Sequence, residues 1–218
     1  MRGARSLVGG LVVVLAACGN TPPAPDWQMN ARSAMERAQE AYVSGNTRVE
    51  AAEFARARAE VARTGRADLL ARLELARCAT RVASLVLEPC SGFAALEQDA
   101  PAPERAYAAY LGGRAQPQDA AALPEQHRPF VLPAAHPAAS LQTVADPLAR
   151  LVAAGVLLQT GRADPSVIAV AIDTASAQGW RRPLLAWLGV QVQRAELGGD
   201  SAEAARIRRR MALVGEPR

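Results

Sequence analysis

This sequence has no lysine and few aromatic residues. All 25 cationic residues are arginine, so a Ser-x-x-Lys nucleophile cannot exist, and neither Gly-x-Ser-x-Gly nor a glycine-rich phosphate loop is present. Aromatic residues make up only 4% of the chain, whereas β-sheets favour aromatic and β-branched residues. Half of the residues are hydrophobic, and alanine, the best helix former, is abundant. The sequence therefore predicts an all-α protein with a packed core.

The net charge of the chain is also small. Of the 25 arginines, two lie in residues 1–17, which contain no acidic residue, and removal of that segment leaves a net charge of +2 against 21 acidic residues. Nucleic-acid binding needs a concentrated basic surface. The charge balance therefore excludes an electrostatic case for a nucleic-acid partner.

The N-terminus has the features of an export signal. Arg2 and Arg5 form a short cationic start, and an apolar run follows from Leu7 to Ala17. As a helix, this run would span roughly 16 Å, about half of the hydrocarbon core of a bilayer. We therefore expect it to direct export and not to remain as a membrane-spanning helix.

The sequence Leu15-Ala16-Ala17-Cys18 closes the apolar run and resembles the lipobox of bacterial lipoproteins. The resemblance implies cleavage before Cys18 and a thioether-linked diacylglycerol on its sulfur. Two or three acyl chains hold a protein on a membrane essentially permanently, whereas one chain binds marginally. Gly19 stands where the sorting rule of this family places Asp for inner-membrane retention, so the resemblance implies the periplasmic face of the outer membrane. The alternative is an ordinary secretory signal with a chance cysteine.

Cys78 and Cys90 are the two cysteines that remain once Cys18 is lipidated. Disulfides persist in an exported protein. Four residues can span up to about 13 Å, and Cys90 must double back along roughly 12 Å of the helix that carries Cys78. The spacing therefore predicts a disulfide, while a redox-active pair would lack the usual Cys-x-x-Cys spacing.

The chain divides into five segments. The lipobox resemblance implies a lipoprotein signal peptide (1–17). Composition and periodicity predict a proline-rich tether (18–26), an N-terminal helical block (27–96), a proline-rich connection (97–140) and a C-terminal helical block (141–214).

Apolar residues at helical spacing predict three helices in the N-terminal block. They cover about 29–42, 47–63 and 69–86, with Asp68 as the N-cap of the third and Pro89 beyond its end. The expected buried faces contain Ala31, Met35, Ala38 and Tyr42, then Ala51, Phe54, Ala57 and Val61, then Leu69, Leu73, Ala76 and Thr80.

The C-terminal block shows the same pattern in four helices. The second of them should begin at Asp164-Pro165, an N-cap followed by proline at the first helical position. Its expected inner face contains Ile168, Ala171, Ile172 and Ala175. The pentapeptide at 64–68 recurs at 160–164, which either chance or an internal duplication explains.

The N-terminal block resembles tetratricopeptide repeats, which are antiparallel helix pairs. With Gly45 at the turn, Ala38, Phe54 and Ala57 occupy positions where the repeat has small, aromatic and small residues. Ala34 stands in place of the usual Trp, and no clean 34-residue period repeats. The resemblance implies a stack of antiparallel helical hairpins with a concave groove for a partner.

Seven prolines between 97 and 140 exclude a long helix there, although a short one is expected from Pro103 to Leu111. Such a segment is either a functional surface loop or a linker. His127 and His136 lie within it, and without further Cys or His ligands they are read as surface residues, so no metal is expected.

Two further groups of residues have a structural and a functional interpretation. Trp180 and Trp187 are more typical of core packing than of a ligand cage, and Pro183 favours a helix start after Trp180. Arg206, Arg208, Arg209 and Arg210 make the last helix basic, which suits a helix C-terminus or, as a weaker alternative, lipid phosphates.

No constellation of acid, base and nucleophile is visible, so we expect neither an enzyme nor a cofactor. The sequence favours a lipid-anchored envelope protein that binds another envelope protein. The alternatives are a peptidoglycan-metabolism enzyme or its activator, and a carrier of a hydrophobic small molecule.

Overall fold

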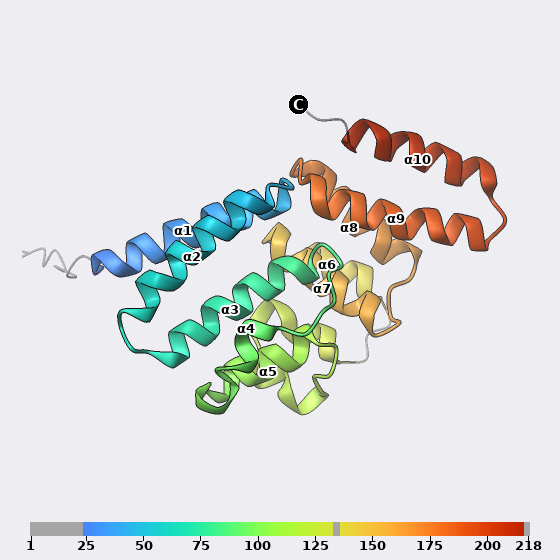
Figure 1. The fold of residues 1–218 in the computed structure, drawn as a ribbon. Helices are drawn as coiled ribbons and strands as arrows, with labels where there is room; N and C mark the ends of the chain where they lie inside the picture. The colour runs from blue at the N-terminus through green and yellow to red at the C-terminus, as the bar shows by residue number, and fades with distance from the viewer. Residues whose placement is uncertain (1–23, 133–135, 216–218) are drawn as a thin grey trace, which may run out of the picture.

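The computed structural model describes residues 24–132 and 136–215, so the export signal, Cys18 and most of the tether lie outside the described residues. Every regular element within these two ranges is helical. In chain order they are α1 (Asp26–Val43), α2 (Thr47–Ala62), α3 (Ala67–Val82), α4 (Ser91–Ala94), η1 (Glu97–Asp99), α5 (Ala102–Leu111), η2 (Pro117–Ala122), η3 (Glu125–Val131), α6 (Pro137–Thr143), α7 (Pro147–Gln159), α8 (Pro165–Ala177), α9 (Arg181–Leu197) and α10 (Ser201–Gly215). The predicted all-α fold is confirmed, and its long helices stack as antiparallel hairpins (Figure 1).

Helices α1 and α2 form the first hairpin. Gly45 makes the turn with φ of +93°, and the Asn46 side chain accepts a hydrogen bond from the Val49 backbone N–H at 3.2 Å, capping α2. A small core joins this hairpin to one face of α3. It consists of Ala31, Ala34, Met35, Ala38, Phe54, Ala57, Val61 and Leu73.

Helix α3 is buried on two faces. Leu73 contacts the α1–α2 hairpin, together with the partly buried Leu69, Leu70 and Ala76. A second face belongs to the main core of the protein, through Ala71, Leu75, Cys78, Ala79 and Val82. The sequence pattern predicted only the first of these faces, because a helix buried on two sides no longer shows a single apolar stripe.

The proline-rich middle is part of the folded body. Tyr110, Leu123 and Phe130 are each at most 2% exposed and belong to the main core. Arg162, which follows α7, donates hydrogen bonds to the backbone oxygens of Phe130 at 2.6 Å and Leu132 at 2.7 Å. Of the two interpretations that the sequence left open, a linker is therefore excluded.

Helix α7 lies at the centre of the main core. A β-carbon at Gly155 would lie 2.5 Å from the Val82 carbonyl oxygen, so the backbones of α7 and α3 approach closely at this glycine. Trp187 of α9 is fully buried, and its indole N–H donates to the Ala83 carbonyl oxygen at 3.2 Å. Both contacts fix the C-terminal end of α3.

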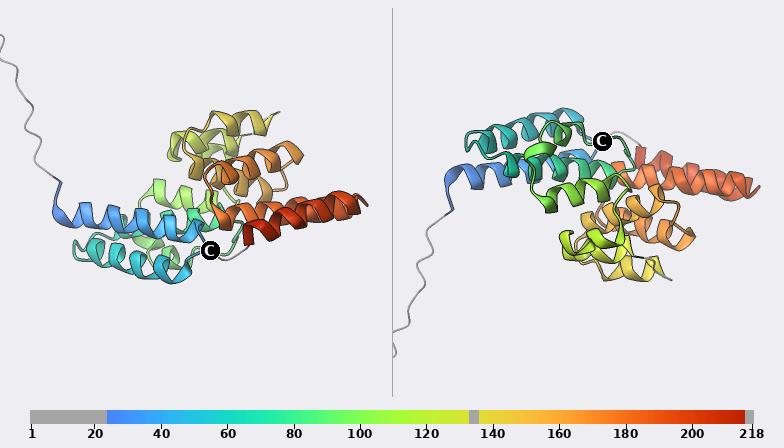
Figure 2. Two further views of the ribbon diagram at one scale, coloured as in Figure 1. Left: turned by 90° about the horizontal axis from the view of Figure 1, so that it is seen from above. Right: turned by 90° about the horizontal axis from the view of Figure 1, so that it is seen from below.

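The last two helices form a hairpin that projects from the body (Figure 2). Helix α10 packs chiefly against α9 and buries only Ala204 and Ile207. Leu197 and Leu213 are 90% and 72% exposed. Little besides α9 therefore holds α10 in place.

Helix α8 begins as predicted, since the Asp164 carboxylate accepts from the Val167 N–H at 2.9 Å and Pro165 is the first helical residue. The prediction that Asp68 caps α3 was wrong. Asp68 is the second residue of that helix, and its carboxylate pairs with Arg66 at 2.5 Å. The two copies of the pentapeptide therefore differ in structure at their last residue.

The predicted end of the third helix near Val86 was also wrong. Helix α3 ends at Val82, and Leu85 adopts the left-handed conformation with φ of +61°. The Val86 N–H donates to the Arg81 carbonyl oxygen at 3.0 Å, which closes the helix end as a left-handed residue usually does.

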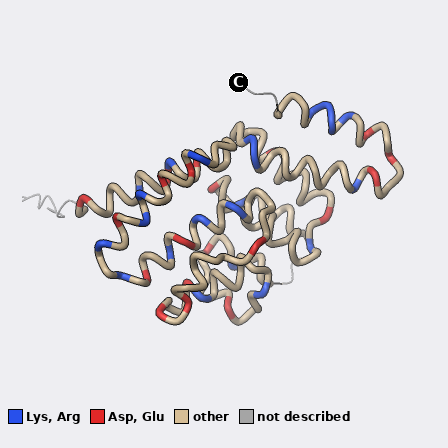
Figure 3. The backbone as a smooth tube through the Cα atoms, viewed as in Figure 1, with Lys and Arg blue, Asp and Glu red and all other residues tan. Residues whose placement is uncertain are grey.

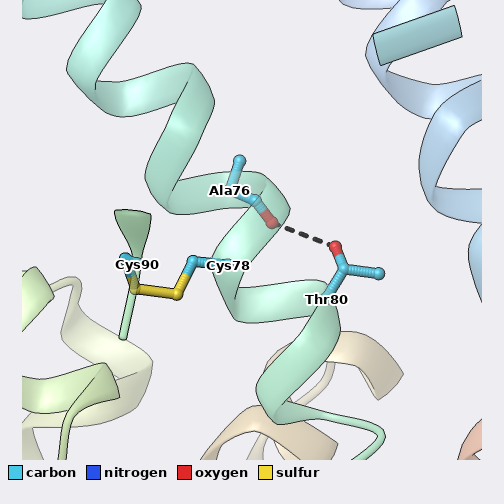
Figure 4. The surroundings of a disulfide bond; sticks show 4 residues. All are labelled: Ala76, Cys78, Thr80 and Cys90. Carbon is cyan, nitrogen blue, oxygen red and sulfur yellow. Dashed lines mark hydrogen bonds between the residues drawn. A yellow bond between two sulfur atoms is a disulfide. The ribbon is translucent and has the colours of Figure 1, made fainter. Parts of the chain in front are cut away.

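Cys78 and Cys90 form a disulfide that joins α3 to the segment before α4 (Figure 4). Their Cα atoms are 5.7 Å apart, within the normal range for a disulfide. Thr80, on the same helix, donates to the Ala76 carbonyl oxygen at 3.0 Å (Figure 4). The disulfide therefore ties α3 to the residues that precede α4.

Candidate binding groove

A cavity with a volume of about 600 Å³ lies between α3, α5, η3 and α7. Its lining is mostly apolar, with Leu75, Ala76, Ala79, Leu123, Leu148, Ala149 and Val152. Tyr107, His127 and Asp146 add polar groups to this lining. A cavity of this size and composition is typical of sites that bind an apolar group with a few polar contacts. We call it the aromatic cavity.

An aromatic cluster forms one wall of the aromatic cavity. The Tyr110 hydroxyl and His127 Nδ1 are 3.2 Å apart, and the two ring centres are 5.0 Å apart. The Tyr107 ring lies 5.6 Å from His127 and stacks on Tyr110 at 6.0 Å. His127 is 2% exposed, so its interpretation as a surface residue was wrong. The grouping of Tyr107, Tyr110, His127 and Phe130 within 24 residues was the sequence signal that could have revealed this cluster.

Burial determines the protonation of this cluster. It lowers the pKa of His127 to about 4, although the negative charge of Asp146 acts in the opposite direction. Burial also raises the pKa of Tyr107 and of Tyr110 well above their ordinary values. At neutral pH the aromatic cluster is therefore uncharged.

The pKa of His127 predicts a loss of stability at acid pH. Above about pH 6.5 the imidazole is neutral in both the folded and the unfolded chain. Between about pH 6.5 and 4 only the unfolded chain takes up the proton, so the free energy of unfolding should fall by up to about 3 kcal/mol and then level off. Urea denaturation at several pH values measures this dependence.

His127→Gln should remove this component, while His136→Gln should keep it, because His136 is exposed. The difference between the two variants isolates His127 from the carboxylates, which titrate in both. Parallel pH profiles for the two variants would contradict the prediction.

A second cavity of about 490 Å³ runs between α1 and α3. It is lined by apolar residues of both helices and by three arginines, among them Arg32 and Arg72. Each of these two pairs with a carboxylate: Arg32 with Glu36 at 2.9 Å, and Arg72 with the buried Glu104 at 2.6 Å. Its charges are therefore largely compensated.

A third cavity of about 270 Å³ lies where the end of α1 meets the start of α7. It is lined by Glu36, Gln39, Glu40, Val43, Asp146, Pro147, Leu148, Gln178 and Trp180. Three of these residues are acidic and none is basic. We call it the acidic cavity.

The three cavities meet at Gln39 of α1, which lines all of them. The aromatic cavity and the acidic cavity also share Asp146 and Leu148. The three cavities therefore lie next to one another, and we call them together the groove; it extends over α1, α3, α5 and α7. Acidic and basic residues are interspersed along the described chain (Figure 3), whereas the lining of the acidic cavity contains acidic residues and no basic one.

Apart from Trp180, the other candidate residues singled out in the sequence lie outside the groove or serve the fold. Trp187 is a core residue, as interpreted, whereas Trp180 is half-buried and lines the acidic cavity. On α10, Arg206 pairs with Glu203 and Arg208 with Glu196. His136 precedes α6 and is exposed. Cys18 lies outside the described residues.

Gln39, Glu40 and Asp146 were not singled out as site residues in the sequence. Each has the appearance of an ordinary polar position on or before a helix. Within residues 24–132 and 136–215, no group of three or more Cys, His, Asp or Glu side chains is arranged to hold a metal ion. The described helices also include none that combines the length and the hydropathy of a membrane span.

No protein-family model matches the sequence, and neither a curated protein nor a solved structure matches the chain.

Proposed function

We propose that this protein is a lipid-anchored envelope protein that faces the periplasm and binds another envelope protein in its groove. The groove is the observation that carries the proposal, because it crosses several helices and combines apolar walls with exposed polar groups. Helical hairpin stacks commonly bind partners on such a surface. The lipobox-like Leu15-Ala16-Ala17-Cys18 supports the anchor.

The anchor is tested by metabolic labelling. We expect radiolabelled palmitate to enter the wild-type chain and not Cys18→Ser, because the thioether needs the Cys18 sulfur. Globomycin should block processing of the wild-type precursor. Cys78→Ser is the matched control, since it removes a cysteine without affecting the lipobox. An unlabelled wild-type chain would contradict the anchor.

The partner is tested by site-specific photocrosslinking in the organism that encodes the protein. A photoreactive residue at Gln39 should yield a defined crosslinked protein, because this position lines all three cavities. The same residue at Gln193, which is exposed on α9, is the control. Crosslinks from Gln193 alone, or from neither position, would contradict binding in the groove.

The aromatic cavity supports a second candidate, a carrier of a hydrophobic small molecule. Its volume of about 600 Å³ lies within the range of ligand sites, and most of its lining is apolar. Organic extraction of the purified protein followed by mass spectrometry distinguishes the two functions. A stoichiometric lipid would favour the carrier. Turnover of purified peptidoglycan would favour the other alternative, a peptidoglycan-metabolism enzyme.

A further inference from the structure

The acidic cavity carries negative charge that the described residues do not neutralise. Glu40 and Asp146 both line it, and neither forms an ion pair within 24–132 and 136–215. One oxygen of each is engaged: Glu40 Oε1 accepts from the Ser44 hydroxyl at 3.0 Å, and Asp146 Oδ1 accepts from the Ala149 N–H at 2.7 Å. The second oxygen of each carboxylate has no hydrogen-bond donor in the described chain.

The nearest arginines along the chain are bound elsewhere. Arg37, one turn before Glu40, pairs with Glu53 of α2 at 2.9 Å. Arg150, one turn after Asp146, donates to the Val144 carbonyl oxygen at 2.7 Å. The charge of Asp146 instead acts on the aromatic cluster, where it adds to burial in raising the pKa of Tyr107 and opposes burial, which lowers the pKa of His127. Within the described residues, no cationic side chain therefore pairs with Glu40 or Asp146, and both carboxylates are exposed to a ligand.

Trp180 gives the acidic cavity an aromatic wall. It is half-buried at the start of α9, opposite the residues contributed by α1 and α7. Indole is the best aromatic partner for an ammonium or guanidinium group, and carboxylates add charge-assisted hydrogen bonds. Val43, Pro147 and Leu148 can contact the alkyl stem of a long basic side chain.

The acidic cavity lies next to the aromatic cavity, with which it shares Gln39, Asp146 and Leu148. A ligand in both would place a cation beside an apolar group. A segment of polypeptide with a basic and an apolar side chain close together has this chemistry. Gln39 is half-buried and lines both cavities, so its side-chain amide can contact a peptide backbone there.

We propose that the groove binds a segment of a partner protein that places a lysine or arginine side chain in the acidic cavity and an adjacent apolar side chain in the aromatic cavity. This inference rests on the proposed function, because it specifies what the partner presents to the groove. It assigns Glu40, Asp146 and Trp180 to recognition of the basic side chain.

The test is selection of short random peptides on the full-length chain solubilised in a non-ionic detergent. Selected peptides should contain a lysine or arginine next to an apolar residue. Replacing that lysine by norleucine should weaken binding about tenfold, the effect expected for loss of one charge-assisted, cation–π contact.

Glu40→Gln with Asp146→Asn should weaken binding of the same peptides about tenfold as well. Both substitutions keep a hydrogen-bond acceptor, and asparagine remains a good N-cap for α7. The matched control is Glu97→Gln with Asp173→Asn, which makes the same change in net charge at two exposed positions outside the groove. It should change the affinity by less than about twofold.

Three outcomes would overturn the inference. Selected peptides without a basic residue would exclude cation recognition. Equal losses in the two double variants would show that only the overall charge matters. Spermidine binding as tightly as the peptides would assign the cavity to small amines. In the first two cases a protein crosslinked from Gln39 would still support the proposed function, so failure of the inference and failure of the function are distinguishable.

Discussion

Replacing Gly155 by alanine is expected to lower the free energy of unfolding by about 3 kcal/mol. The added β-carbon would lie 2.5 Å from the carbonyl oxygen of Val82 and 3.0 Å from its Cγ1 atom. The oxygen belongs to the backbone of α3, so rotation of a side chain cannot relieve the clash. The two helices must separate instead, and the core between them must loosen. Chemical denaturation followed by circular dichroism measures the loss.

Gly189→Ala is the matched control. Gly189 also lies inside a helix, α9, but a β-carbon there would have no neighbour within 4 Å. Alanine is the better helix former, so this variant should gain about 0.5–1 kcal/mol in free energy of unfolding. If both variants were stabilised alike, the close approach of α7 and α3 would not depend on Gly155.

Trp187→Ala should lower the free energy of unfolding by about 4 kcal/mol, because it leaves a large cavity in the core. Trp187 is fully buried, and its indole N–H is bonded to the Ala83 carbonyl oxygen at the end of α3. Trp187→Phe keeps most of the apolar contact but leaves that oxygen without its donor, so it should cost about 1–3 kcal/mol.

The control for this prediction is Trp180→Ala, since Trp180 is half-buried beside the acidic cavity. Its loss should cost less stability than that of Trp187 while weakening peptide binding. The two tryptophans are close in sequence, and the predicted effects separate a core residue from a binding residue. Equal stability losses for the two alanine variants would contradict this separation.

The local structure of the C-terminal block could be predicted because its signals are local. The start of α8 needs only an acid before a proline, and its inner face repeats at helical spacing. Ile168, Ala171, Ile172 and Ala175 are all at most 3% exposed, as expected from that pattern. The N-cap, the helical spacing of the apolar residues and their burial all agree in α8, so the sequence pattern alone is enough to predict this helix.

The middle region could not be predicted in the same way. Proline density correctly excluded a long helix, but it conceals short helices whose apolar residues follow no extended period. His127 was interpreted as a surface residue because histidine is usually at least partly exposed. Only the tertiary structure brings Tyr110 within hydrogen-bond distance of its ring.

The residues that line the groove could not be predicted from the sequence patterns of the separate helices. The resemblance to helical repeats implied that a groove exists, but not which residues line it. Gln39 and Asp146 are more than one hundred residues apart, and they line the same cavities only because α1 and α7 both lie against α3. Ordinary polar residues on separate helices give no joint signal in one sequence.

The indole bond from Trp187 to Ala83 joins residues 104 positions apart and gives the fold a property that linear repeat arrays lack. In such arrays each unit touches only its neighbours, so they can be shortened unit by unit or can fray progressively from one end. In this protein α9 contacts the end of α3 directly, and segments from both halves of the chain pack around α3. The body must consequently assemble and come apart in one cooperative step, whereas α10 can detach and return without disturbing it.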